Sequence, residues 1–326
     1  MTSPSLEALL TSAHVVAIPT RTRFRGITVR EAVIFDAPNG ASEFSPFPEY
    51  DDAEAARWLA ASLEYGWGTV PTPLRTTIPV NATVPAVAAD SVAHILERFP
   101  GCTTAKVKVA ERGQSLADDI ARVAAVREIM GEEARIRIDS NCGWSVSEAH
   151  EAITKLAPYD LEYAEQPVAT VPELAQLRDM LGGSVRIAAD ESVRKAEDPL
   201  AVARAGAADL LIVKAQPLGG IASALDIVAE AGLPVVISSA LDTSIGISMG
   251  LHLAAALPEG MLAGACGLAT VALLDGDVAA DPLLPVDGEL AMRRPVLAPE
   301  ALERFRAAPD REAWWLERVQ RCFATL

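Results

Sequence analysis

The sequence is short of histidine, cysteine and positive charge, and each shortage removes a class of function. Its 326 residues include four histidines and four cysteines, without a CxxC pair or any spacing typical of zinc ligands. Lys and Arg number 28 against 44 Asp and Glu, so the net charge is −16. This balance argues against nucleic acids and anionic membranes as partners. Scattered cysteines without an evident disulfide framework favour a reducing cytoplasm as the location.

Long apolar runs are also missing. Half of the residues are hydrophobic, yet no uninterrupted stretch approaches the ~20 residues of a membrane-spanning helix. The opening segment, MTSPSLEALLTSAHVVAIP, lacks the basic start of a signal peptide. We therefore expect neither a membrane partner nor export, and the chain is long enough for a large core and two domains.

From about residue 76, apolar β-rich segments alternate with helical ones. The alternation predicts parallel strands, and eight strands separated by seven helices favour a barrel over an open doubly wound sheet. The open sheet would usually place a glycine-rich phosphate turn after its first strand, and residues 81–90 contain none. The predicted strands lie in IPVNATVPAV, TTAKVKVA, ARIRIDSN, LEYAEQP, VRIAADES, ADLLIVKAQP, PVVISSA and MLAGACGLATV.

The two ends of the chain have a different character. Residues 1–75 combine the alternating segment GITVREAVIFDA with a helix-like one, and residues 273–326 are rich in loops before a final amphipathic helix. Neither end by itself has the pattern of a complete domain. We predict an α/β protein in which residues 76–272 form a (β/α)7β TIM-like barrel and both termini join in one α+β capping domain.

Charged residues end successive predicted strands. Catalytic groups of such barrels come from the carboxyl ends of several strands, so these residues are expected to meet at one mouth. Three carboxylates cannot share a small site without a cation, and oxygen ligands favour Mg²⁺ before Mn²⁺ or Ca²⁺. The residues are Lys106, Lys108, Asp139, Glu165, Asp190 and Lys214.

The two lysines in KVK raise the question of their protonation. Strand periodicity points Lys106 and Lys108 to the same face, where an unpaired ammonium would be costly. A lysine acts as a base only when neutral, and neighbouring positive charge lowers its pKa. Lys106, Lys214 and a divalent ion would supply that charge to Lys108. The ion would also stabilise an enediolate formed when a proton α to a carboxylate is lost.

Each residue also has a simpler interpretation when it is taken alone. An acid at a strand end could be a turn or helix-cap residue, and Lys214 could extend past the barrel rim into water. Arg137, on the face of Asp139, is more typical of a structural ion pair. Glu162 and Glu191 compete as metal ligands, although strand periodicity places Glu162 on the outer face.

Five ordered segments, KVK, DSN, EQP, ADES and VKAQPLGG, resemble the enolase superfamily, and the muconate-lactonizing subgroup is the most similar. The resemblance covers nearly the whole chain. It implies that Lys108 is the general base, that Lys106 assists carboxylate binding and that Lys214 steadies the enediolate. It also implies a metal site of Asp139, Glu165 and Asp190, with Asp190 preferred to Glu191.

Within that subgroup, RTRFRGITVREAV, IPVNATVPAV and SSALDTSIG resemble a dehydratase of menaquinone biosynthesis. The resemblance implies a metal-dependent β-elimination on a small dicarboxylate. Two alternatives stay open: racemisation of N-succinylamino acids, and a barrel that binds a small acid without catalysis. Arg25 could also lie on a solvated edge strand rather than over the mouth. The predicted substrate contacts are Arg25, Arg137, Asn141, Ser238, Ser239 and Gly264.

Overall fold

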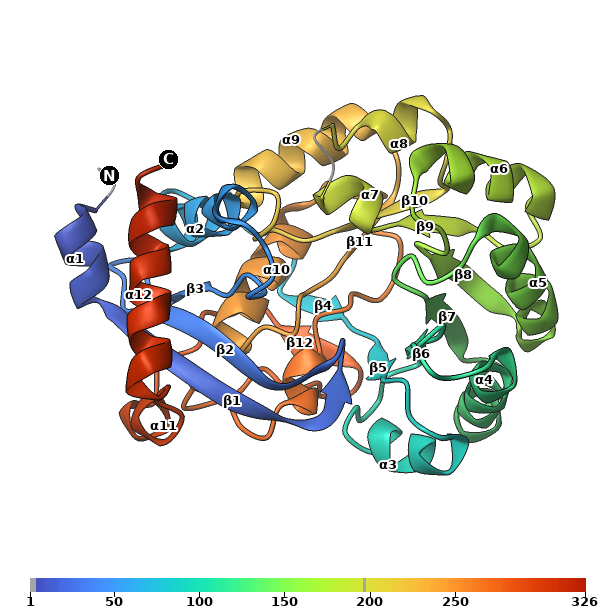
Figure 1. Ribbon diagram of the computed structural model, residues 1–326, viewed down its shortest axis with the longest axis horizontal. Coiled ribbons are helices and arrows are strands. Elements are labelled where there is room, and N and C mark those ends of the chain that lie inside the picture. Colours follow the sequence, from blue (N-terminus) through green and yellow to red (C-terminus); the bar gives the residue numbers. More distant parts are fainter. Residues whose placement is uncertain (1–3, 196–197) are drawn as a thin grey trace.

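The structure, a computed structural model, describes residues 4–195 and 198–326. Its larger part is a curled sheet of seven parallel strands surrounded by helices, and its smaller part is a three-stranded antiparallel sheet with helices from both ends of the chain (Figure 1). This architecture is the capped α/β barrel that the sequence predicts.

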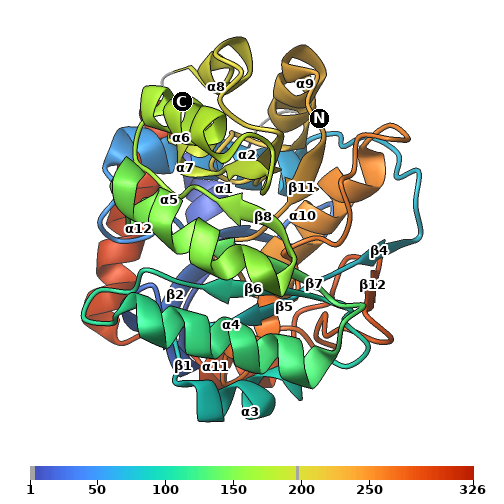
Figure 2. The same ribbon diagram turned by 90° about the vertical axis from the view of Figure 1, so that its right-hand side faces the viewer.

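The seven barrel strands are hydrogen-bonded in chain order, so each βα unit lies beside the next. Helices α4, α5 and α6 cover the outer face of β6, β7 and β8 (Figure 2). The strands are β5 (Ala82–Val84), β6 (Thr104–Lys108), β7 (Arg135–Asp139), β8 (Leu161–Glu165), β9 (Ile187–Ala189), β10 (Leu210–Val213) and β11 (Val235–Ile237). The α-helices are α3 (Val92–Leu96), α4 (Leu116–Met130), α5 (Val146–Leu156), α6 (Val171–Leu181), α7 (Glu191–Arg194), α8 (Ala201–Arg204), α9 (Ile221–Ala231) and α10 (Ser244–Ala256). Short 3-10 helices are η1 (Ala89–Ser91), η2 (Ala157–Tyr159) and η3 (Thr270–Leu273).

The eighth predicted strand is irregular. Residues 262–267 make only isolated parallel bridges, from Leu262 and Gly267 to β11 and its end, and from Cys266 to Val80. Gly264 has φ +103°, a left-handed conformation that interrupts an extended strand. The segment still closes the barrel, because it lies between β11 and the residues that precede β5.

The first predicted strand is divided in two. Its start forms β4 (Thr77–Pro79), which pairs antiparallel with β12 (Glu289–Ala291) outside the barrel sheet. Its end forms β5, which pairs with β6. The C-terminal segment therefore returns to the barrel before it reaches the cap.

The cap is built from both ends of the chain, and its first helix, α1, lies beside its last, α12 (Figure 1). Its sheet contains β1 (Ala13–Phe24), β2 (Ile27–Phe35) and β3 (Ser42–Phe44). Its helices are α1 (Leu6–Thr11), α2 (Asp52–Trp67), α11 (Pro299–Arg304) and α12 (Pro309–Phe323). Helix α12 packs against α2 and β1, and its buried Trp315 meets the ring of Phe44 edge-on at 5.9 Å. Among the described residues no helix is long and apolar enough to cross a membrane.

Alternation along the barrel strands determines which side chains point inward. On β10, Leu210 and Ile212 belong to a small interior cluster, whereas Leu211 and Val213 pack outward in the main core. The inward face continues with Lys214 directly after the strand. The same alternation on β6 directs Lys106 and Lys108 into the barrel, because their apolar neighbours belong to the outer core.

Candidate active site

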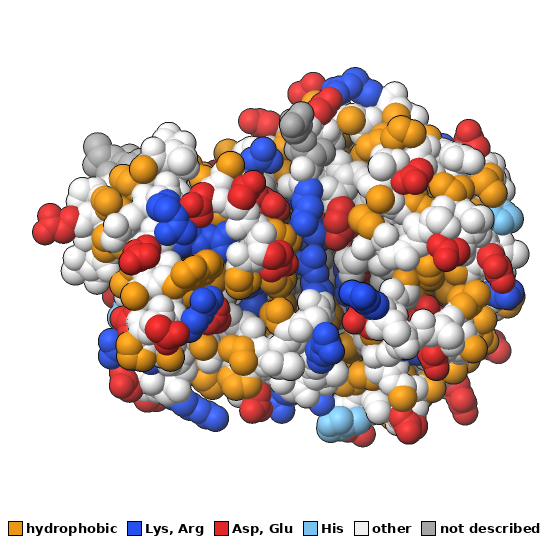
Figure 3. Space-filling view, in the orientation of Figure 1, with side chains coloured by type: hydrophobic (Ala, Val, Ile, Leu, Met, Phe, Trp, Pro, Cys, Tyr) orange, Lys and Arg blue, Asp and Glu red, His pale blue; other side chains and the backbone are white. Residues whose placement is uncertain are grey.

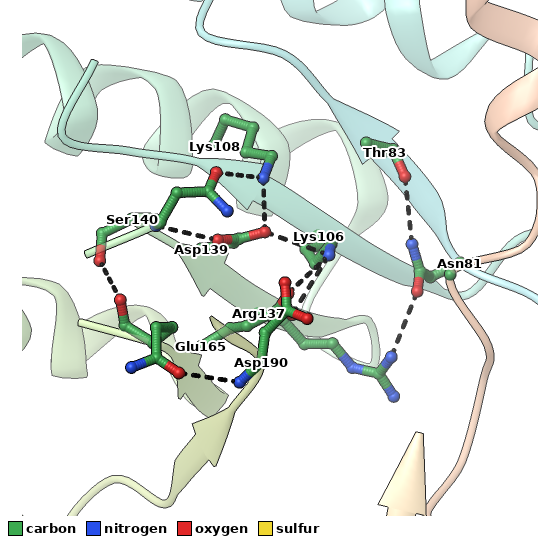
Figure 4. Close-up of polar contacts among 12 residues, drawn as sticks. Asn81, Thr83, Lys106, Lys108, Arg137, Asp139, Ser140, Glu165 and Asp190 are labelled. Atoms are coloured by element: carbon green, nitrogen blue, oxygen red, sulfur yellow. Dashed lines mark hydrogen bonds and ion pairs between the residues drawn. The ribbon is translucent and has the colours of Figure 1, made fainter. Parts of the chain in front are cut away.

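Six charged side chains gather at the carboxyl ends of β6 to β10. Figure 4 shows Lys106 and Lys108 on one side of β6, with Asp139 of β7 between their amino groups. Asp190 follows β9 and Lys214 follows β10. The structure therefore brings together the charged residues predicted at the strand ends, and none of them is more than 9 % exposed: Lys106, Lys108, Asp139, Glu165, Asp190 and Lys214.

Strand register explains why these groups meet. Parallel pairing places Lys108 opposite Asp139, and Asp139 opposite Glu165. Side chains at paired positions project from the same face of a sheet. Three neighbouring strands thus place one cation and two anions side by side. Because the barrel buries these groups, the attraction between their charges is stronger than it would be in water.

Lys106 lies between two carboxylates. Its Nζ is 3.1 Å from Asp139 Oδ2 and 3.0 Å from Glu165 Oε1. Burial opposes the charge of this ammonium, but the charges of Glu165 and Asp139 outweigh it and raise the pKa of Lys106. Lys106 is therefore the lysine of the pair that stays charged.

Lys108 has a different environment two residues later. Its Nζ donates to Asp139 Oδ2 and to Asn141 Oδ1, each at 2.5 Å, and it lies 5.4 Å from the centre of the Phe24 ring of the cap. Burial, together with the positive charge of Lys106, lowers the pKa of Lys108 although Asp139 opposes the shift. A lowered pKa makes the neutral amine, and hence base catalysis, more accessible.

Lys214 faces these groups from the other side of the mouth. Its Nζ lies 2.5 Å from both carboxylate oxygens of Asp190. Burial lowers the pKa of Lys214, and the positive charge of Arg194 lowers it further. The negative charge of Asp190 acts in the opposite direction but does not cancel the shift. The site thus holds two lysines with lowered pKa and one with raised pKa.

The acids form a donor set that suits a divalent cation. Asp139, Glu165 and Asp190 offer only oxygen atoms, and each is 1 % exposed. Burial, followed by the negative charge of Asp139, raises the pKa of Glu165 to about 8. A cation among these acids would relieve that repulsion. Across the described residues no three acidic, His or Cys side chains are already spaced as ligands of one ion, since lysines engage the carboxylates instead.

A cavity of about 230 Å³ opens beside Lys108, between the cap loop and the barrel. Arg25 and Asn141 both line it, as does Arg112, which the sequence did not suggest. Figure 3 shows Lys and Arg side chains gathered along the hollow between cap and barrel. Arg25 has φ +49° and stacks its guanidinium over the ring of Phe47 at 4.6 Å. The lining of this opening carries more positive than negative charge, since Arg23, Arg25 and Arg112 outnumber its one acid, Glu111.

Ser238 and Ser239 lie at the carboxyl end of β11, on the rim of the same mouth. The Ser239 hydroxyl donates to Gly267 O at 2.8 Å and lies 2.8 Å from Thr270 Oγ1. Ser238 is buried and its side chain lies against Gly267, where an added Cβ would be 2.6 Å from Ser238 Oγ. Both serines are close to the site, and their contact with substrate stays a prediction.

Arg137 and Gly264 are corrections to the predicted substrate contacts. Arg137 points toward the amino end of the barrel, where Nε lies 2.5 Å from Glu162 Oε2 and Nη1 donates to Ala265 O at 2.6 Å. Gly264 borders the same ion pair, with Arg137 Nη2 3.2 Å from the position of an added Cβ. Neither residue is placed to touch a molecule at the mouth. Both lie before the carboxyl ends of their strands, and the Arg137 side chain is directed to Glu162, near the start of β8.

Glu162 also departs from its predicted outer face. The register between β7 and β8 shifts after Ile136, so that Arg137 pairs with Tyr163 and Glu162 is the extra residue. Its carboxylate then turns onto the buried Arg137. Because its carboxylate pairs with Arg137 and not with the groups of the mouth, Glu162 is not placed as a rival metal ligand.

Two family descriptions match this chain. Residues 88–300 match the family described as "Enolase C-terminal domain-like" and residues 15–66 the one described as "Enolase N-terminal domain-like". The chain therefore belongs to the enolase superfamily, as its ordered strand-end segments indicate. Sites of this superfamily combine a Lys or His base with divalent metal ions.

Similar proteins within the superfamily share one name. Proteins named o-succinylbenzoate synthase from Mycobacterium bovis (strain BCG / Pasteur 1173P2) and Mycolicibacterium smegmatis are each 54% identical over 324 residues. The matches cover 99% of this chain and 97% and 98% of the two relatives. Among solved structures, 2-chloromuconate cycloisomerase from Rhodococcus opacus 1CP matches with a TM-score of 0.75 and 24% identity, over 91% of this chain and 98% of its own. That likeness establishes the fold.

The position of Arg137 leads to a prediction about stability. Arg137→Met should lower the free energy of unfolding by about 3 kcal/mol, the lower end of the cost of breaking a buried ion pair, because Arg135 also contacts Glu162. Replacing both partners, as Arg137→Met with Glu162→Leu, should recover much of the loss. Urea unfolding measures both. An unchanged stability with a tenfold higher KM would instead return Arg137 to the substrate site.

Proposed function

We propose that this protein is an o-succinylbenzoate synthase. It would dehydrate 2-succinyl-6-hydroxy-2,4-cyclohexadiene-1-carboxylate to o-succinylbenzoate, a lyase reaction of menaquinone biosynthesis. The observation that carries the proposal is the full-length similarity at 54% identity to proteins of that name. The site supports it independently, because a lysine of lowered pKa lies beside acids and a positively lined cavity.

Lys108 is the proposed general base. Its lowered pKa makes the neutral amine available, and its contacts with Asp139 and Asn141 hold Nζ in place. Lys108 would take the proton from the ring carbon that carries the carboxylate. The resulting ammonium would then deliver that proton to the departing hydroxyl, so that water leaves and the ring becomes aromatic. One residue would thereby serve both halves of the β-elimination.

Lys214 and Lys106 would stabilise negative charge without moving the proton. Lys214 reaches the mouth from β10, opposite the strand that carries Lys108, and stays close to Asp190. Its charge would face the negative charge that develops after proton loss. Lys106, kept charged by its two carboxylates, would attract the ring carboxylate of the substrate.

We propose Mg²⁺ as the cofactor, with Mn²⁺ as a substitute. Asp139, Glu165 and Asp190 would hold it through oxygen ligands. When bound, the ion supplies positive charge that stabilises the carboxylate group next to the carbon losing its proton.

The cavity beside Lys108 supports a small dicarboxylate as the substrate class. A small dicarboxylate has one anionic group for the acid-and-lysine site and another on its succinyl arm. Arg25 lines the cavity beside Lys108 and is the proposed contact for the arm. Ser238 and Ser239, on the β11 rim, are proposed to hydrogen-bond the ketone or carboxylate from the other side.

Racemisation of N-succinylamino acids is the second candidate. The observation that favours it is the pair Lys108 and Lys214, which reach the site from opposite sides and both have a lowered pKa. Two such lysines could remove and return a proton on opposite faces of one carbon. The succinyl arm is common to both substrates, so weak cross-activity fits the same cavity.

Removing one ligand charge tests the metal site. Glu165→Gln should weaken Mn²⁺ binding by at least about tenfold, because a carboxylate ligand becomes a neutral amide of nearly the same shape. Glu162→Gln is the control, since that acid lies at the other end of the barrel. Electron paramagnetic resonance of free Mn²⁺ measures both affinities. Equal affinity in Glu165→Gln and wild type would refute this ligand assignment.

The two lysines should separate in their response to substitution. Lys108→Ala should abolish both dehydration and exchange of the α-proton, because one group performs both steps. Lys214→Ala should be severely impaired through lost charge, whereas Lys214→Arg should retain part of the rate because it keeps a charge with altered geometry. Absorbance of the diene and proton exchange in D₂O give the two readouts. Dehydration by Lys108→Ala at the wild-type rate would exclude Lys108 as the base.

The ratio of two activities distinguishes the candidate reactions. With Mg²⁺, kcat/KM for dehydration should exceed that for N-succinylamino acid racemisation by at least about tenfold, or ~1.4 kcal/mol in transition-state stabilisation. Both rates are measured on one enzyme preparation. A ratio that favours racemisation would select the second candidate, and binding of metal and acid without turnover of either substrate would identify a non-catalytic barrel.

A further inference from the structure

A buried arginine next to the site contacts three different oxygens. Arg194, the last residue of α7, is 2 % exposed. Its Nε donates to Asp190 Oδ1 at 3.1 Å, its Nη2 to Glu191 Oε1 at 2.7 Å and its Nη1 to Tyr50 Oη at 3.1 Å. Because the guanidinium is planar and its donors are fixed, these three contacts together define one orientation of the side chain.

The contact with Glu191 continues to Lys108. The same Oε1 of Glu191 accepts a hydrogen bond from Asn141 Nδ2 at 3.2 Å, and Asn141 Oδ1 accepts from Lys108 Nζ at 2.5 Å. With its oxygen toward the lysine, the Asn141 amide turns its nitrogen to the Glu191 carboxylate, and this second hydrogen bond favours that orientation. Glu191 therefore fixes the orientation of Asn141, and an unbroken line of hydrogen bonds joins Lys108 to Asp190 by way of Arg194.

The third contact ties this line to the cap. Tyr50 lies between β3 and α2, is buried, and meets the ring of Phe47 edge-on at 5.6 Å. Phe47 in turn lies under the guanidinium of Arg25. The acid end of the site and the loop over the cavity are therefore connected through two aromatic rings and Arg194.

We propose that Arg194 is a positioning residue. It holds the carboxylate of Asp190 in the orientation needed for the metal and, through Glu191 and Asn141, holds the amine of Lys108 toward the substrate. Glu191 supports Asp190 in this arrangement and does not replace it. The inference rests on the proposed function, since it takes Lys108 as the base and Asp190 as a ligand. Residues of this kind around metal sites typically affect affinity or activity by 10–100-fold.

The first test uses Arg194→Lys, which keeps the charge but cannot reach three acceptors at once. We expect the Mn²⁺ dissociation constant to rise about tenfold and kcat of dehydration to fall about 10–100-fold, with KM within about threefold of wild type. Arg127→Lys is the matched control, because Arg127 binds backbone carbonyls of Gly131, Ala134 and Tyr159 away from the site. Losses equal to those of Arg127→Lys, or both quantities within threefold of wild type, would overturn the proposal.

Glu191→Gln tests whether Glu191 only supports its neighbours or binds the metal itself. We expect kcat to fall at least about tenfold while Mn²⁺ affinity changes by less than tenfold, because the ligand set is intact and only the orientation of Asn141 is disturbed. A larger loss of affinity with unchanged kcat at saturating Mn²⁺ would make Glu191 a ligand and overturn its assigned role.

Tyr50→Phe removes a single hydroxyl, keeps the aromatic ring and is the smallest change that breaks the contact with Arg194. It should lower kcat in the same direction as Arg194→Lys but less, and the double variant should be no worse than Arg194→Lys alone, since both act on one contact. If the kcat losses of the two single variants multiplied in the double variant, Tyr50 and Arg194 would act independently, which would contradict the proposal. If wild type binds Mn²⁺ but does not dehydrate, the proposed function fails, whereas the affinity measurements still decide the role of Arg194.

Discussion

Mutual neutralisation of buried charges at the barrel mouth is the interaction on which the site depends. Each ammonium lies beside a carboxylate: Lys106 beside Asp139 and Glu165, Lys108 beside Asp139, and Lys214 beside Asp190. An isolated charge at this depth would cost several kcal/mol, so each group requires its partners. The cap is part of this constraint, because Phe24 and Tyr50 cover the ion pairs from above.

Position within this network gives similar lysines different chemistry. Lys106 is flanked by two carboxylates and keeps its proton, whereas Lys108 shares one carboxylate with Lys106 and has a lowered pKa. The charge that Lys106 retains is one cause of the shift at Lys108. Two lysines on the same face of one strand therefore lower the pKa of one of them, which favours its role as a base.

Much of this arrangement could be predicted from the sequence, because it follows from strand period and strand order. The βα alternation indicated the barrel, and the residues at the strand ends placed Lys108, Asp139 and Lys214 at the same mouth. The final amphipathic helix expected near the C-terminus is α12, Pro309–Phe323. Such features are local, or follow from the general geometry of parallel barrels.

The wrong predictions come from local irregularities in the strands, which the two-residue period of a regular strand does not predict. A register shift between β7 and β8 turned Glu162 onto Arg137, and a left-handed Gly264 broke the eighth strand. Arg194 was overlooked although its spacing from Asp190 and Glu191 fits one turn of helix. Its contact with Tyr50 joins residues 144 positions apart and needs the three-dimensional fold.

The most direct measurement of the central claim is the titration of individual lysines by NMR. The chain has only five lysines, at positions 106, 108, 155, 195 and 214, so side-chain labelling gives few signals and single substitutions assign them. The account predicts that the Lys108 signal titrates below the ~10.4 typical of lysine, while Lys106 stays protonated to a higher pH than Lys108. Lys106 and Lys108 titrating together at the ordinary value would contradict it.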